Sequence, residues 1–198
     1  NNNDGTKKAA NEPIQADGKI AKAQSFDGSN DYINLTQAVD VTTVSFWLNP
    51  RAIVNDTVLY DATASNTIQG DGAGKWLIWD GSNHKFSQGP TLNEWHYYAF
   101  VYDGSHYELY KDGVYQEEVV SNKINIDTIG RPLTGYTIDG LMDEVRISGV
   151  ARSSAWIKAS YNSLNDTLIK YLKEETLFSR RGIFYVPINT SNFFHFFR

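Results

Sequence analysis

One stretch in the first half of the chain combines aromatic rings with short polar side chains. Rings that stack on a sugar, beside amide and carboxylate groups that hydrogen-bond its hydroxyls, are the chemistry of a carbohydrate site. The predicted ligand-binding residues are Asn66, Gln69, Trp76, Trp79, Asp80, Asn83 and His84. The alternative interpretation is that Trp76 and Trp79 fill the hydrophobic core. Core positions are the expected ones for Trp47, Trp95 and Trp156.

Acidic side chains offer no clear catalytic pair. A retaining glycosidase needs two carboxylates about 5 Å apart, one of them with a raised pKa. The nearest candidates are Glu108, the pair Glu117 and Glu118, and the pair Asp143 and Glu144. Neighbouring residues on a strand point to opposite faces, so neither adjacent pair can converge on one bond. We therefore predict no catalytic residues, and glycoside hydrolysis ranks third among the functions considered.

The elements that hold these residues are expected to be short strands. Asp-Gly pairs recur along the chain, and this dipeptide suits tight hairpin turns. Between them lie runs rich in Val, Ile, Thr, Tyr, Phe and Trp, with no interleaved helical pattern. This pattern predicts an all-β fold, either a sandwich or a barrel.

Residues 95–120 form the clearest unit, a predicted three-stranded meander with turns at residues 103–105 and 111–114. Both faces of its first strand are apolar or aromatic, so one is expected in the core and the other on a concave surface or under a loop. His96 and His106 flank the first hairpin and could meet across it. With no acid in register, we expect them to pack or to hydrogen-bond and not to bind zinc or act as a base.

The composition excludes several classes of protein. The 198 residues carry a net charge of −5 and a pI of about 5.3, which argues against a nucleic-acid binder. The absence of Cys excludes disulfides, zinc–thiolate sites and a thiol nucleophile. No apolar run of about 18 residues exists, so we expect no membrane span.

Helical signals are confined to the C-terminal third. Ser153 is a suitable N-cap for a helix over residues 154–161, with Trp156 as its anchor. A second helix that begins near residue 165 and a strand at residues 183–186 are expected further on. The tail ends in four aromatic rings that either pack back on the sandwich or meet another chain. These rings are Phe193, Phe194, Phe196 and Phe197.

Four segments, in this order, resemble the laminin-G-like, concanavalin A-like jelly-roll family. They are AQSFDGSNDYI at residues 23–33, VSFWLNP at 44–50, EWHYYAFVYDG with LYKDG at 94–113, and IDGLMDEVRI with VARS at 138–153. The resemblance implies an antiparallel two-sheet jelly-roll sandwich, followed by a short helical segment and the aromatic tail. It divides the chain into an N-terminal lead (1–13), a laminin-G-like domain (14–163) and a C-terminal extension (164–198).

The resemblance also implies a structural calcium ion, which the family often carries. Calcium takes six to eight hard oxygen ligands, and the polar turn over residues 27–31 offers several of them. In similar folds a carboxylate from the penultimate strand region completes the shell. The predicted metal ligands are therefore Asp27, Asn30, Asp31 and Asp143. The alternative is an Asp-Gly turn whose side chains cap backbone N–H groups.

The family mostly binds sugars or proteins, and only branches with added catalytic carboxylates are enzymes. We therefore predict a non-catalytic module that binds a glycan or a surface protein in adhesion, placed outside a cell, on its surface or on a virion. The alternative is a virion or phage structural protein, a capsid decoration or fibre, that is anchored by residues 164–198.

Overall fold

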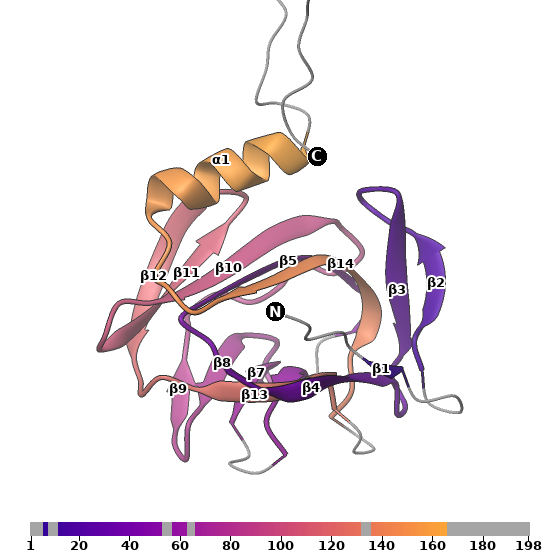
Figure 1. Cartoon of the computed structure of the whole chain (residues 1–198), viewed down its shortest axis with the longest axis horizontal. Helices are drawn as coiled ribbons and strands as arrows, with labels where there is room; N and C mark the ends of the chain where they lie inside the picture. The colour runs from indigo at the N-terminus through magenta and orange to yellow at the C-terminus, as the bar shows by residue number, and fades with distance from the viewer. Residues whose placement is uncertain (1–5, 8–11, 53–56, 63–65, 132–135, 166–198) are drawn as a thin grey trace, which may run out of the picture. The chain divides into compact units, whose positions relative to one another are not determined.

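A computed structural model gives the arrangement of residues 6–7, 12–52, 57–62, 66–131 and 136–165 (Figure 1). The predicted second helix, the strand at residues 183–186 and the tail residues Phe193, Phe194, Phe196 and Phe197 lie outside the described residues. Within them, strands dominate and form two sheets in which every pair of neighbouring strands is antiparallel. The predicted all-β, two-sheet jelly-roll sandwich is confirmed.

The two sheets contain seven strands each. In spatial order the first sheet contains β1 (Thr6–Lys7), β4 (Tyr32–Asp40), β13 (Asn125–Gly130), β6 (Thr57–Tyr60), β7 (Thr67–Gly70), β8 (Trp76–Trp79) and β9 (Asn83–Lys85). In spatial order the second sheet contains β12 (Val114–Val120), β11 (His106–Lys111), β10 (His96–Tyr102), β5 (Thr43–Pro50), β14 (Asp139–Ser148), β3 (Lys22–Asp27) and β2 (Ile14–Asp17). Strands from opposite ends of the domain, β3 and β14, therefore pair directly.

Aromatic rings join the two sheets across the sandwich. Trp76 of β8 lies with its ring centroid 5.2 Å from those of Tyr98 and Phe100 of β10. Phe46 of β5 packs edge-on against the same indole at 6.3 Å. All four side chains are buried, and edge-on ring contacts add to the burial of apolar area. This cluster is the centre of the main core.

The central strands of the second sheet are buried on both faces. Tyr98 and Phe100 of β10 point into the main core, whereas Tyr97, Ala99 and Val101 point to the other side. The helix α1 (Ser154–Leu164) covers this second face, on the side of the sheet away from the first sheet (Figure 1). The second apolar face of the meander therefore lies under a helix and not under a loop or on an open concave surface.

Helix α1 begins at the predicted cap. The Ser153 hydroxyl accepts a hydrogen bond from the Trp156 backbone N–H at 3.3 Å. Ile157 is the fully buried anchor, whereas Trp156 is only partly buried beside the Arg152 guanidinium. No helix in the described part of the chain combines the length and hydrophobicity needed to cross a membrane.

The three-stranded meander of β10, β11 and β12 is confirmed, but the expected meeting of its two histidines is wrong. The antiparallel register pairs Tyr102 with Tyr107, so His96 and His106 lie at opposite ends of the ladder. The expectation that no acid is in register is also wrong. Asp112 lies beside His96, with Oδ2 of the carboxylate 2.7 Å from Nδ1 of the ring. His96 therefore ties the β11–β12 turn to the start of β10.

The packing of α1 predicts the effect of removing its anchor. We expect Ile157→Ala to lower the free energy of unfolding by about 2–4 kcal/mol, because it opens a cavity against Trp47 and Tyr97. Chemical denaturation of the full chain measures this change. The exposed Val150→Ala is the control and should stay within about 0.5 kcal/mol of the native chain. A loss as small as that of the control would mean that α1 does not cover the sheet.

Candidate ligand-binding surface

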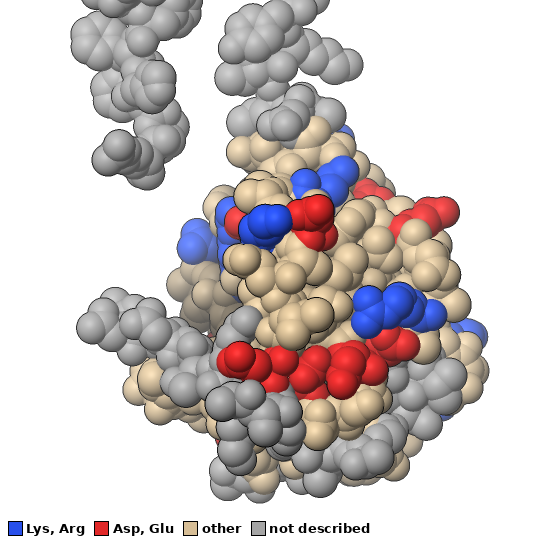
Figure 2. Space-filling model, turned by 90° about the vertical axis from the view of Figure 1, so that its right-hand side faces the viewer, with Lys and Arg blue, Asp and Glu red and all other residues tan. Residues whose placement is uncertain are grey.

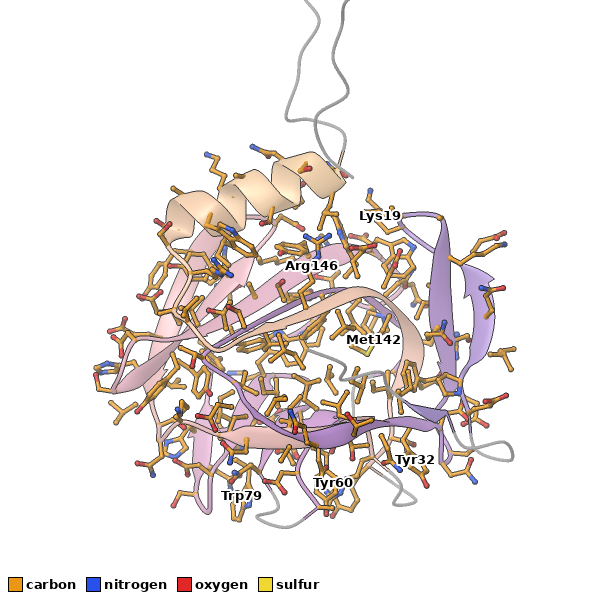
Figure 3. All side chains as sticks on the ribbon, in the orientation of Figure 1. Lys19, Tyr32, Tyr60, Trp79, Met142 and Arg146 are labelled. Atoms are coloured by element: carbon orange, nitrogen blue, oxygen red, sulfur yellow. The ribbon has the colours of Figure 1, made fainter. Side chains whose placement is uncertain are left out.

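A row of polar and aromatic side chains crosses the first sheet on the face away from the second sheet. Cross-strand partners project to the same face, so the strand register identifies the members of the row. These residues, the outer row, are Asn34, Thr128, Tyr60, Thr67, Trp79 and Asn83. Ile68 and Ile78, one position along β7 and β8, belong to the main core, and Figure 3 shows Tyr60 and Trp79 extending to the other side.

Trp79 is the tryptophan of this chain that neither belongs to a core cluster nor packs against one. Trp47 and Trp76 are buried, and Trp95 and Trp156 pack against the cluster beneath α1. Trp79 is partly exposed instead, next to the exposed amide of Asn83. The structure therefore leaves one predicted ring in a position where a ligand can stack on it.

The strand next to Trp79, β7, carries a hydroxyl group and an amide group on the same face of the sheet. Thr67 is the cross-strand partner of Trp79, and its hydroxyl donates a hydrogen bond to Oε1 of Gln69 at 2.9 Å. Gln69 is partly exposed and projects to the same face of β7 as Thr67. Asn66 lies at the start of β7, where its carbonyl accepts a hydrogen bond from the Asp61 N–H at 2.9 Å. Trp79, Asn83 and Gln69 are therefore the predicted residues that share this face.

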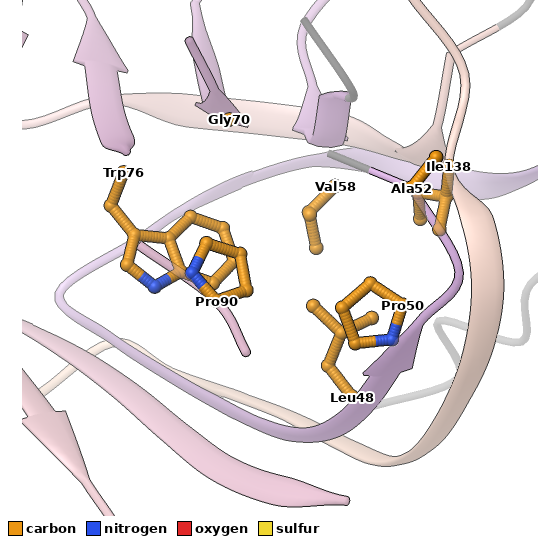
Figure 4. A pocket seen from close by; sticks show the side chains of 8 residues that line it. All are labelled: Leu48, Pro50, Ala52, Val58, Gly70, Trp76, Pro90 and Ile138. Atoms are coloured by element: carbon orange, nitrogen blue, oxygen red, sulfur yellow. The ribbon is translucent and has the colours of Figure 1, made fainter. Parts of the chain in front are cut away.

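Trp76 does not belong to the surface. It is fully buried and lines a small apolar hollow between the sheets, together with Leu48, Val58 and Ile138 (Figure 4). Its predicted role in ligand binding is wrong for a geometric reason. Trp76 and Trp79 are three positions apart on one strand, and residues at odd spacing point to opposite faces. The alternative interpretation, a core residue, holds for Trp76 and not for Trp79.

Asp80 and His84 form a structural latch at one end of the sandwich. The Asp80 carboxylate accepts hydrogen bonds from Nε2 of His84 at 2.8 Å and from the Asn122 backbone N–H at 2.7 Å. It also accepts from the Ser82 N–H, the Asn122 amide and the Ser121 hydroxyl. With these five donors the side chain, which is only 5% exposed, has no capacity left for a sugar hydroxyl.

The electrostatics of the latch agree with this role. Burial opposes the ionisation of Asp80, but the hydrogen bonds from Asn122 and His84 outweigh it and hold the pKa of the carboxyl below its ordinary value. A polar hollow beside the latch is lined by His84, Tyr102 and Ser105, among other residues. Since Asp80 itself is saturated, this hollow is secondary to the outer row as a ligand site.

The predicted calcium ligands do not form one shell. The ladder between β3 and β14 places Asp139 opposite Asp27, and Asp143 lies four residues further along β14, roughly 13 Å away. There Asp143 accepts a hydrogen bond from the Ile20 N–H at 2.7 Å. Among the described residues, no group of three or more His, Asp or Glu side chains is arranged to hold a metal ion.

The turn after β3 instead follows the capping alternative. Asp27 Oδ1 accepts a hydrogen bond from the Ser29 N–H, and Asp31 Oδ2 accepts one from the Asp27 N–H. Across the ladder, Asp139 forms an ion pair with Arg51 at 2.7 Å. Figure 2 shows a band of acidic side chains on the side of the molecule where β2 and β3 lie. Acidity on this side is therefore not by itself a sign of a metal site.

Carboxylates that were considered for hydrolysis also accept hydrogen bonds from other parts of the fold. Glu117 accepts hydrogen bonds from the Ser87 and Gln88 N–H groups. The register places Glu108 opposite Glu118, a pairing that distance along the sequence does not reveal. Hydroxyl groups of two neighbouring tyrosines donate to this pair, Tyr110 to Glu108 at 2.7 Å and Tyr115 to Glu118 at 3.3 Å. The pair lies on the second sheet, remote from the outer row.

The latch predicts a pH-dependent stability. We expect Asp80→Ala to lower the free energy of unfolding by roughly 1–3 kcal/mol at pH 7, because it leaves the Asn122 and His84 donors unpaired. A carboxyl whose pKa is depressed in the folded chain stabilises it above the ordinary value of 3.8 and loses this effect as the pH falls through the folded-state pKa. Denaturation of both chains between pH 7 and pH 3 should therefore show the difference shrinking below about pH 4.

The control for this experiment is Asp17→Asn, which removes an exposed carboxylate next to Lys22. Water screens such a pair, so stability should hardly change. A difference between Asp80→Ala and the native chain that stays constant down to pH 3 would contradict the ionised latch.

Comparison with known proteins identifies the family and the structural neighbours of this fold. The family model described as the concanavalin A-like lectin/glucanases superfamily matches residues 27–158. The comparison with curated proteins gives no match. Among solved structures, domain 4 of AbnA, a GH43 extracellular arabinanase from Geobacillus stearothermophilus solved with arabinotriose, is 22% identical with a TM-score of 0.58. The alignment covers 74% of this chain and 79% of that domain.

Two further structures share the architecture. The heptameric SAP-like pentraxin of Limulus polyphemus is 13% identical over 67% of this chain and 76% of its own, with a TM-score of 0.51. The ligand-binding domain of botulinum neurotoxin serotype D, solved with N-acetylneuraminic acid, is 13% identical over 82% of this chain and 47% of its own, with a TM-score of 0.57. At these identities the likeness shows the fold alone. The family match spans most of the sandwich, and the chain therefore belongs to the concanavalin A-like lectin/glucanases superfamily.

Proposed function

We propose that this protein is a non-catalytic glycan-binding module and that its ligand lies on the outer row of the first sheet. The observation that carries the proposal is the partly exposed ring of Trp79 next to the exposed Asn83, with the partly exposed Gln69 on the same face of the sheet. An indole offers a broad flat surface to the apolar face of a sugar ring, and neighbouring amides fix its hydroxyls. The arabinanase domain solved with arabinotriose supports the proposal by its fold.

The second sheet is less suited to bind a glycan. Its large rings, Trp47 and Tyr97, are covered by Tyr161 and Ile157 of α1, with ring centroids of Trp47 and Tyr161 5.7 Å apart. A ligand would have to displace the helix to reach them. The outer row needs no such rearrangement, because Trp79 and Asn83 already reach the solvent.

Binding without hydrolysis fits the chemistry of the row. Its members are two amides, two hydroxyls and two aromatic side chains, and none of them is a carboxylate. Hydrolysis by this superfamily's enzymes would need a pair of acids facing one sugar ring. Elsewhere, Asp80 and Glu117 accept hydrogen bonds from backbone N–H groups. Glu108 and Glu118, which face each other on the second sheet, accept hydrogen bonds from tyrosine hydroxyls. Enzymes exist among the relatives, since the arabinanase domain belongs to a glycoside hydrolase.

A glycan-binding module of this kind acts where glycans are displayed, so we place it outside a cell or on a cell or virion surface, in adhesion. The alternative of a virion structural protein depends on residues 164–198, which include the four phenylalanines of the tail. It predicts assembly through the tail and no specific affinity for a sugar. The two functions therefore differ in one measurable property, saturable glycan binding.

The proposal predicts the effect of removing the indole. We expect Trp79→Ala to weaken glycan binding at least tenfold, or about 1.4 kcal/mol, because an aromatic anchor carries much of the affinity of a small contact. A glycan array identifies the ligand, and isothermal titration of the native chain and the variant measures the change. The unfolding transition should stay almost unchanged, since Trp79 lies outside both core clusters.

Tyr115→Ala is the matched control, because it removes an exposed ring from the second sheet. It should bind the same glycan with unchanged affinity. Equal losses in both variants would refute the outer row as the site, and an array without any specific signal would refute glycan binding. Release of new reducing ends from the bound glycan would refute the non-catalytic part of the proposal.

A further inference from the structure

Arg131 lies over the ring of Tyr60, a member of the outer row. Its guanidinium carbon lies 4.5 Å from the ring centroid of Tyr60 and 4.8 Å from that of Tyr136. Tyr60 is a member of the row and is only 7% exposed, whereas Tyr136 is 43% exposed. Arg131 thus contacts two tyrosine rings, one buried and one exposed. Contacts with the faces of aromatic rings do not use the N–H groups of a guanidinium, which keep their capacity for hydrogen bonding.

The backbone of β13 directs Arg131 to this place. Gly130, the last residue of the strand, has a φ of +75°. A Cβ atom there would come within 2.8 Å of the Asp31 carbonyl oxygen, so only glycine fits this turn. The chain thereby leaves the ladder opposite Tyr32, and the next residue is the stacked arginine.

The charge of Arg131 has no carboxylate partner among the described residues. None of the ion pairs that they form includes Arg131. Its buried Nε also lacks a hydrogen-bond partner there. Asp127, four residues before Arg131 in the chain, accepts hydrogen bonds from the Ala62 N–H and the Thr128 hydroxyl. A guanidinium that contacts two rings and forms no ion pair within the described part of the chain retains its capacity to bind an anion.

We propose that Arg131 recognises a carboxylate on the ligand, so that the glycan carries an acidic sugar such as a uronic or sialic acid. The planar N–H fork of arginine matches the two oxygens of a carboxylate, and the adjacent Tyr136 ring offers a surface for the sugar that bears it. The chain as a whole has a net charge of −5, so its overall field does not attract an anion. A preference for acidic glycans must therefore come from this local contact. This inference rests on the proposed glycan-binding function and names its ligand class.

The test uses pairs of glycans that differ only at the carboxyl group. An array carries oligosaccharides with a uronic or sialic acid, each beside its carboxyl-reduced form, and titration gives the two affinities for the full chain. We expect the native chain to prefer the acidic member at least tenfold. Arg131→Gln should lose this preference and keep the weaker affinity for the reduced member, whereas Arg131→Lys should keep part of the preference because it keeps the charge without the planar fork.

Arg152→Gln is the matched control. Arg152 also stacks on an aromatic ring, with 4.9 Å between its guanidinium carbon and the Trp156 centroid, but it lies beside α1 on the other sheet. It should keep the full preference. Equal binding of acidic and reduced glycans by the native chain would overturn the inference and leave the proposed function standing, as would an undiminished preference in a folded Arg131→Gln chain. Absence of binding to any glycan would overturn both.

Discussion

The structure depends on the double burial of β5 and β10. The side chains of β10 are largely apolar or aromatic on both faces, and on β5 the large rings of Phe46 and Trp47 lie next to each other on opposite sides of the strand. Burial of one face against the first sheet stabilises the sandwich, and burial of the other face requires α1. The outer face of the second sheet is thus occupied by the chain itself. The proposed ligand surface therefore lies on the first sheet, where Trp79 remains partly exposed.

The acidic residues of this chain mostly organise turns. Asp71 accepts hydrogen bonds from the Ala73 and Lys75 N–H groups, and Asp103 accepts them from those of Ser105 and His106. Such carboxylates compensate backbone groups that a tight turn leaves without a partner. The oxygens of these carboxylates are thereby engaged within the fold.

Local patterns made much of the fold predictable. Alternating aromatic runs between Asp-Gly turns predicted the all-β class and the meander, because strand and turn preferences act over a few residues. The Ser153 cap predicted the start of α1 for the same reason. The sequence also allowed the prediction that only one of two tryptophan rings can belong to the candidate site. Trp76 and Trp79 had to face opposite sides of β8 because of their odd spacing.

Which of those sides faces the core was decided by tertiary structure alone, because it depends on the sheet that packs against β8. The same holds for the ladder that pairs Asp27 with Asp139 and thereby separates it from Asp143. The residue types, the turns and the alternation along the strands follow from local sequence. The strand register assembled the outer row and the stack on Arg131 from segments far apart in the chain. Register results from the joint burial of both sheets, and no local stretch of sequence contains that information.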